Sequence, residues 1–150
     1  MDIDAACEFA AKLAPSVTQE LFGGDWISLR IGGKWFMLIE LDAEEPRIAL
    51  KLDPEHGSDL RDHWSGIRPA WHMNKRHWND VFLNEVPDDL IRQLITESYT
   101  LVRKGLPKKV RDALDVQDAT PVEPSISMNE EGEVVVKKTG RRPGGMPELD

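Results

Sequence analysis

The side chains best suited to chemistry lie close together between residues 69 and 78, which read Pro-Ala-Trp-His-Met-Asn-Lys-Arg-His-Trp. Aromatic rings stack on nucleic-acid bases, and lysine and arginine pair with phosphates or carboxylates. The segment is therefore typical of a site for a base, a phosphate or an anionic partner. The candidate binding residues are Arg68, Trp71, His72, Asn74, Lys75, Arg76, His77, Trp78 and, near the end of the last predicted helix, Lys108 and Lys109.

A purely structural role accounts for the same segment, and it is the interpretation that the sequence favours. Tryptophans in strands usually pack, paired histidines are usually hydrogen-bonded, and a Lys-Arg turn is usually solvated. A metal centre needs more ligands than two facing histidines, and Asp80 is the one nearby acidic candidate. We therefore predict no metal site and no cofactor.

Catalysis has the least support of the functions considered. Cys7 lies in an alanine-rich segment, no glycine-rich phosphate loop occurs, and no nucleophile has a matching base at a recognisable spacing. Asp53 and Glu55 flank Pro54 as an N-cap and a first-turn acid, which explains both carboxylates without acid-base chemistry. We predict that the protein is not an enzyme, and the sequence identifies no small-molecule substrate.

The near-palindrome of the 69–78 segment predicts a β-hairpin. A two-residue turn at Asn74-Lys75 would set Trp71 opposite Trp78 and His72 opposite His77. Because side chains alternate between faces, the tryptophans would share one face and the histidines the other. Which face is buried stays open at this point, since a bulge would reverse part of the scheme.

The elements that must position this hairpin follow from apolar periodicity and from capping and turn residues. We predict helices at 4–14, 54–64 and 87–104, and strands at 26–31, 35–41, 47–52, 70–73 and 77–83. The order is α-β-β-β-α-β-β-α. The predicted fold class is α+β, a two-layer sandwich with an antiparallel sheet.

Composition divides the chain into a domain at 1–109 and a tail at 110–150, which contains proline and glycine and lacks the apolar periodicity of a core. The tail is predicted to be largely irregular, with a short hairpin at 126–138. The net charge of -8 opposes phosphate binding by the whole molecule, so any nucleic-acid site must be local. A single cysteine, an acidic N-terminus and the lack of a long apolar run favour the cytoplasm and no membrane contact.

Several separate motifs, in order along residues 3–109, resemble the MmcQ/YjbR family. They are Lys51-Leu52-Asp53-Pro54-Glu55, Leu60-Arg61, Ile67 to Trp78, Glu97-Ser98-Tyr99 and Leu106-Pro107-Lys108-Lys109. The resemblance implies a two-layer domain with the element order above, grouped with secretion-chaperone-like and frataxin-like (CyaY-like) folds. It also implies a DNA-binding label and no catalytic residues. Pro15-Ser16 replaces a frequent Pro-Gly, and the tail lies outside the pattern.

Two functions remain open from the sequence. The first is a small DNA-binding domain that uses the hairpin and the Lys108-Lys109 pair. The alternative is a protein-interaction or chaperone-like adaptor with no nucleic-acid role, which docks another protein or a second copy of itself. Five tryptophans and an acidic surface suit the alternative.

Overall fold

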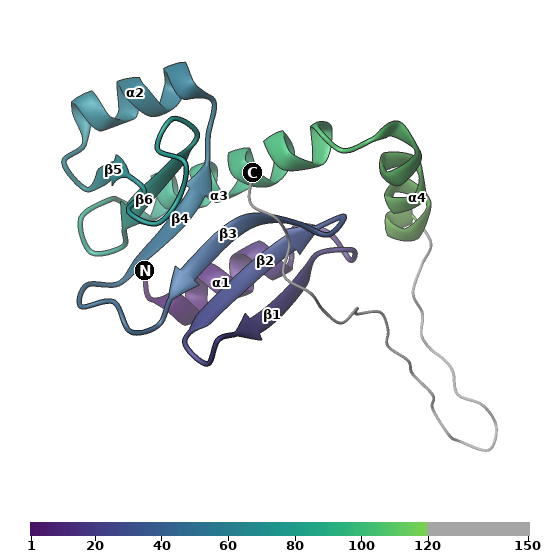
Figure 1. Cartoon of the computed structure of the whole chain (residues 1–150), viewed down its shortest axis with the longest axis horizontal. Coiled ribbons are helices and arrows are strands. Elements are labelled where there is room, and N and C mark those ends of the chain that lie inside the picture. The colour runs from purple at the N-terminus through teal and green to yellow at the C-terminus, as the bar shows by residue number, and fades with distance from the viewer. Residues whose placement is uncertain (120–150) are drawn as a thin grey trace.

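The structure, a computed structural model, describes residues 1–119 and contains helices and one antiparallel sheet, which confirms the α+β fold class (Figure 1). The elements are α1 (Ile3–Ala11), β1 (Thr18–Phe22), β2 (Trp26–Ile31), β3 (Lys34–Glu40), β4 (Arg47–Lys51), α2 (Pro54–His63), β5 (Ile67–Pro69), β6 (Trp78–Phe82), α3 (Asp88–Lys104) and α4 (Lys108–Ala119). No helix in this range is long and apolar enough to cross a membrane.

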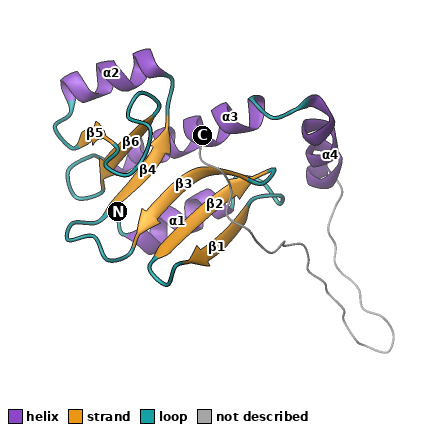
Figure 2. Cartoon of the chain, viewed as in Figure 1, coloured by secondary structure: helices purple, strands orange, loops and turns teal. Residues whose placement is uncertain are grey.

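The six strands follow the order β1-β2-β3-β4-β6-β5. The predicted two-residue turn between β2 and β3 is present, and Gly32 and Gly33 take φ values of 61° and 84° that side chains rarely adopt. The sheet ends on one side at β1 and on the other at β5. Figure 2 shows α2 crossing between β4 and β5, beside the β5 edge.

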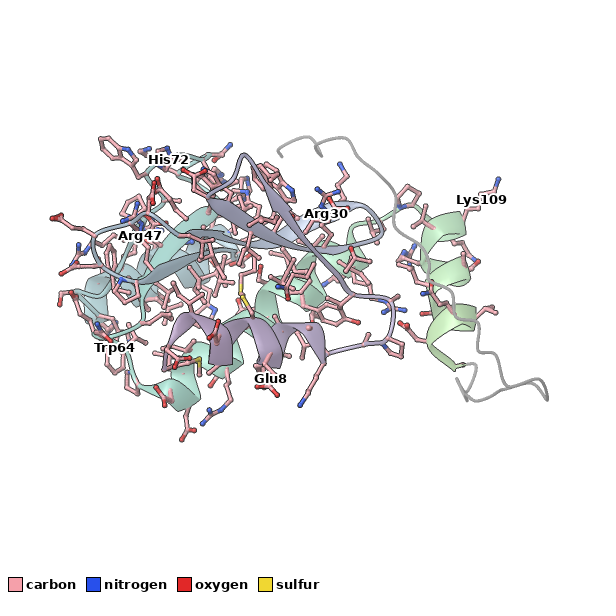
Figure 3. The ribbon with its side chains drawn as sticks, turned by 90° about the horizontal axis from the view of Figure 1, so that it is seen from below. Glu8, Arg30, Arg47, Trp64, His72 and Lys109 are labelled. Atoms are coloured by element: carbon pink, nitrogen blue, oxygen red, sulfur yellow. The ribbon has the colours of Figure 1, made fainter. Side chains whose placement is uncertain are left out.

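Helices α1 and α3 cover one face of the sheet and form the main core with it (Figure 3). The apolar stripe of α3, with Ile91, Leu94 and Ile95 fully buried, packs on β3 and β4. A polar contact fixes the register of this packing. The buried Ser98 hydroxyl donates to the Phe36 carbonyl at 2.6 Å and accepts from the Lys51 amide at 2.9 Å.

The helix starts agree with the sequence prediction. The Asp2 carboxylate accepts from the Ala5 amide at 2.8 Å at the start of α1. The Asp53 carboxylate accepts from the amides of Glu55 and His56 at 3.1 and 3.2 Å at the start of α2. Both contacts satisfy amides that have no partner within the first helical turn.

The sequence prediction missed strand β1, an edge strand. Its residues are mostly exposed, so the alternation of buried and exposed side chains that identifies a strand is weak. Leu21, which lies in β1, is 63% exposed. The pairing of Thr18 to Phe22 with β2 therefore depends on backbone hydrogen bonds more than on burial.

The boundary predicted at residue 109 lies within helix α4. This helix buries one side chain, Leu114, and is tied to the domain by polar contacts. The Asp118 carboxylate accepts from the Ser16 amide at 2.8 Å and from Arg103 at 2.6 Å. The apolar contacts of α4 with the main core come from Val110 and Leu114, a stripe too short to have revealed the helix from sequence. The predicted 126–138 hairpin lies outside the described residues.

The predicted hairpin at 70–83 is wrong in its first strand. Strand β5 lies earlier, at Ile67–Pro69, and pairs Ile67 with Val81 and Pro69 with Asn79. Residues 71–77 form a loop, so Trp71 does not face Trp78 and His72 does not face His77. The ladder ends where the Ala70 amide donates to the Trp78 carbonyl at 3.0 Å. Beyond that point, side chains form the hydrogen bonds to the backbone amides and carbonyls of the loop.

Candidate functional site

Part of the sheet face opposite α1 and α3, at its β4 and β6 end, is covered by residues 70–77, which we call the 70–77 loop (Figure 1). Figure 3 shows His72 of this loop on the side of the sheet away from Glu8 of α1. A second apolar cluster lies between the sheet and the loop. Its buried members are Leu38, Ala49, Ala70 and Trp78, and Phe22, Trp26, Trp35 and Met73 pack against them.

Internal hydrogen bonds hold the 70–77 loop in one shape. The Lys75 ammonium donates to the carbonyls of Ala70 and Trp71 at 3.0 and 3.1 Å. The Asn74 carbonyl accepts from the Trp78 amide at 2.9 Å, and the Asn74 side chain accepts from the Arg76 amide at 2.9 Å. Five backbone groups are thereby satisfied without a strand ladder. These bonds order the loop in the absence of a bound partner.

The loop is fastened to the sheet through Asp80 of β6. The Asp80 carboxylate accepts from the Trp71 amide at 3.2 Å and lies 3.5 Å from Nε of Arg47. Arg47 also contacts Glu40 at 3.3 Å, and Nε2 of His72 lies 3.5 Å from the same Glu40 oxygen. Burial raises the pKa of Asp80, although the Trp71 amide and Arg47 oppose this shift.

This network of charges encloses little space. The cavity beside it, lined by Trp26, Glu40, Arg47, His72 and Asp80 among others, measures ≈ 10 Å³. That volume holds about one water molecule. The network therefore joins the loop to the sheet, and its size leaves no room for a substrate.

The loop presents Trp71 to solvent. Its indole is 70% exposed, and the Lys75 ammonium lies 5.8 Å from the ring centroid. His72 meets the Trp71 ring edge-on at 6.2 Å between centroids. The exposed Arg76 makes no side-chain hydrogen bond or ion pair with any residue from 1 to 119. An apolar ring and an available guanidinium thus share one ordered loop.

Other predicted site residues are already occupied or lie elsewhere. Arg68 donates to the Ser65 carbonyl at 2.9 Å and to Glu85 at 3.1 Å, and its guanidinium lies 4.1 Å from the Phe82 ring centroid. Trp78 is only 1% exposed and belongs to the apolar cluster, so it lies in the interior.

Lys108 and Lys109 do not join the loop. They open helix α4, and Figure 3 places Lys109 at the opposite end of the molecule from His72. Lys108 is paired with Asp112 at 2.9 Å.

Burial, with a smaller contribution from Asp4, raises the pKa of Cys7 to about 11, so its thiol remains protonated and a poor nucleophile near neutral pH.

Sequence reasoning missed the aromatic stack on the same face of the sheet. Phe22 stacks on Trp26 and on Trp35, with ring centroids 6.1 and 5.7 Å apart. Beside it, Arg30 pairs with Glu20 at 2.8 Å. The alternation of Trp26, Ser28 and Arg30 along β2 was the available signal, since these residues share one face.

Fold and site together define a small α+β domain with one helix-covered sheet face and one face that carries an ordered, aromatic and charged loop. The chain belongs to the YjbR family, because the YjbR family model matches residues 13–101. This assignment confirms the resemblance found in the sequence.

Two curated relatives from Escherichia coli support the assignment. The protein YbdF, described as uncharacterised, is 39% identical over 89 residues, which are 59% of this chain and 73% of YbdF. The protein YjbR, also described as uncharacterised, is 32% identical over 93 residues, 60% of this chain and 79% of YjbR.

Solved structures show the same fold. The crystal structure of the Deinococcus radiodurans protein DR2400, described as a DUF419 domain, superposes with a TM-score of 0.69 at 30% identity and covers 76% of this chain and 88% of that one. A crystal structure of a protein from Pseudomonas syringae gives a TM-score of 0.59 at 29% identity over 67% of this chain and 98% of its own.

Proposed function

We propose that this YjbR-family domain binds single-stranded nucleic acid, DNA in the first instance, through the 70–77 loop. The observation that carries the proposal is the exposed indole of Trp71 on a loop that Lys75 and Asp80 hold in place. An ordered aromatic ring offers a stacking surface to an unpaired base at little entropic cost. The neighbouring Arg76 supplies a cation for the adjacent phosphate.

The charge balance sets the expected strength of binding. The chain as a whole carries -8, and Glu85 and Glu40 already pair with Arg68 and Arg47. Few cations therefore remain for phosphates, so we expect weak affinity, of order micromolar or above at low salt, that falls as salt rises. The proposal includes a cytoplasmic location and a non-enzymatic role.

The test is a titration of the full chain with a ten-nucleotide oligothymidine at low salt, followed by fluorescence anisotropy of the labelled oligonucleotide. Stacking on Trp71 predicts that Trp71→Ala weakens binding by about 1–3 kcal/mol, and that Arg76→Ala weakens it and lowers its salt dependence. Lys12→Ala is the matched control, because Lys12 is exposed at the end of α1 and, within residues 1–119, pairs only with Glu8, at 3.0 Å.

The result that would overturn the proposal is the absence of binding at low salt with protein well above micromolar concentration. Equal affinity of the wild type and Trp71→Ala would also overturn it, because the loop would then contribute nothing. Lys75 is unsuitable for this test, because its ammonium holds the loop together. A loss of binding in a Lys75 variant could come from a disordered loop or from a lost contact with the nucleic acid.

A protein partner at the same loop is the alternative, favoured by the exposure of an apolar ring on an acidic chain. Exposed tryptophans are frequent at the centres of protein interfaces. If the protein purifies as a dimer that Trp71→Ala converts to a monomer, and if no oligonucleotide binds, the adaptor function is supported instead.

A further inference from the structure

A histidine lies between the exposed ring of the 70–77 loop and the sheet. The imidazole of His72 lies edge-on to the Trp71 indole, with 6.2 Å between ring centroids, and edge-on to the Trp26 indole of β2, at 5.4 Å. The His72 side chain is 45% exposed, so it exchanges protons readily with solvent. The ring that we propose as a stacking surface therefore borders a side chain that can gain or lose a charge near neutral pH.

Charged groups from the sheet and from the loop face His72. Nε2 of His72 lies 3.5 Å from Oε1 of Glu40 in β3, and the same oxygen accepts from Arg47 of β4 at 3.3 Å. Asp80 of β6 lies 3.5 Å from Nε of Arg47 and interacts electrostatically with both His72 and Lys75. Figure 3 shows His72 and Arg47 at the same end of the molecule. His72 is thus in contact with a compact network of charges.

The charges of this network cancel while the imidazole is neutral. Glu40 and Asp80 supply the negative charges, and Arg47 and Lys75 supply an equal number of positive ones. The cavity beside them, ≈ 10 Å³, holds about one water molecule, so solvent screens these charges less than at an open surface. A proton on His72 therefore gives the network a net positive charge next to Trp71.

A proton on His72 also changes how firmly its ring is held. At 3.5 Å, the contact between Nε2 and Glu40 is too long for a strong hydrogen bond, so its strength depends mainly on charge. The imidazolium carries a proton on both ring nitrogens and is attracted by the Glu40 carboxylate, whereas the neutral ring is attracted only weakly. Protonation therefore restricts His72, and with it the Trp71 ring that lies against it. A restricted ring loses less entropy when a base stacks on it.

We propose that His72 is a positioning residue for Trp71 and that a proton on His72 strengthens the binding of a single nucleic-acid strand to the 70–77 loop. The proposal rests on the proposed nucleic-acid function and adds its regulation by pH. The imidazolium holds the Trp71 ring in place through Glu40 and offers a positive charge to the phosphate beside the stacked base. Histidines gain their proton between about pH 8 and pH 5, so the affinity rises as the pH falls through this range. By linkage, binding of the strand also draws a proton onto the protein.

The first test follows the free protein and needs no ligand. In the full chain labelled with ¹⁵N and ¹³C, NMR records the ring signals of His72 and the indole N–H signal of Trp71 from about pH 8 to pH 5. The expected result is that both signals shift with one midpoint and that the Trp71 signal stays constant in His72→Gln. A Trp71 signal that does not follow the titration of His72 overturns the positioning role.

The second test measures the Kd of labelled ten-nucleotide oligothymidine at low salt, at pH 6 and at pH 8. The expected Kd of the wild type is about three- to tenfold lower at pH 6, and that of His72→Gln is the same at both pH values within about twofold. His72→Lys carries its charge throughout and should bind tightly at both. His63→Gln, at an exposed histidine of α2, and Asp80→Asn, which removes a carboxyl whose pKa is raised by burial, should keep the wild-type ratio.

The outcomes separate this proposal from the function on which it rests. Absence of oligothymidine binding at both pH values overturns the nucleic-acid function, and the pH dependence of binding is lost with it. Binding with the same Kd at pH 6 and pH 8 overturns the role of His72 and leaves the loop site intact. A pH dependence that persists in His72→Gln also overturns that role, because another group would then carry the proton.

Discussion

The backbone amide of Trp71 donates to the carboxylate of Asp80 at 3.2 Å, so the most exposed tryptophan of the described chain is anchored by a buried acid on the neighbouring strand. This bond links the surface that we propose as functional to the interior of the sheet. The strength of this hydrogen bond depends on whether the Asp80 carboxyl is charged.

Burial raises the pKa of Asp80, so the folded state binds a proton more readily than the unfolded chain at pH above the ordinary carboxyl value of 3.8. Stability therefore falls as pH rises from that value through the raised pKa, and the loss is complete above it. Asp80→Asn has no titrating group at this position, so its stability should not show this decrease with rising pH. Urea unfolding of both proteins across the acid range measures the difference, with Asp112→Asn on exposed α4 as the control. A difference independent of pH would contradict the prediction.

Lys75 and Arg76 are adjacent cations with different structural roles. Lys75→Ala removes the donor to two loop carbonyls and should lower the free energy of unfolding by about 0.5–1.5 kcal/mol and red-shift the tryptophan emission. Arg76→Ala removes no side-chain hydrogen bond or ion pair made within residues 1–119 and should change stability by less than about 0.5 kcal/mol. Chemical denaturation of the pair tests this, and equal losses would refute it.

The two tryptophans of the 69–78 segment should differ sharply in their effect on stability. Trp78 is 1% exposed and Trp71 is 70% exposed. Trp78→Ala leaves a cavity under the loop and should cost about 3–5 kcal/mol, while Trp71→Ala should cost less than about 0.5 kcal/mol. Thermal and urea unfolding give both values. Similar costs would show that the loop packs differently in solution.

Gly32 and Gly33, the two turn glycines between β2 and β3, should differ in their tolerance of alanine. Both have positive φ, but a Cβ on Gly32 would lie 2.6 Å from a methyl group of Leu106, whereas nothing lies within 4 Å of one on Gly33. Gly33→Ala should cost about 1 kcal/mol from backbone strain alone, and Gly32→Ala about 2–3 kcal/mol because overpacking adds to it. Denaturation curves of the two variants measure both losses of stability. The prediction fails if Gly33→Ala is the more costly change.

The elements that sequence could predict are those whose signals are local. The α3 helix shows a three-and-four apolar spacing and ends at Gly105, and β2 and β3 flank the Gly32-Gly33 turn. The missed elements carry weaker local signals. Strand β1 pairs with the next strand, β2, but its side chains are mostly exposed, so no apolar alternation marks it. Helix α4 is held by the contacts of Asp118 with Ser16 and Arg103, and Ser16 lies 102 residues away in sequence.

The 69–78 segment was chosen as a candidate site by its composition, but its predicted geometry was wrong. The symmetry of the 69–78 segment predicted a ladder, yet Pro69 offers no amide and Lys75, Asn74 and Asp80 satisfy the loop backbone instead.

The two ends of the sheet are unequal, and this limits how copies of the chain can associate through their backbones. The β5 edge is three residues long, ends in Pro69 and lies beside α2, while the β1 edge is five residues long and contains no proline. Main-chain pairing can therefore extend the sheet on one side only. Two copies joined edge to edge would use up that side on both, so association of this kind closes at a symmetric pair and does not propagate into a filament.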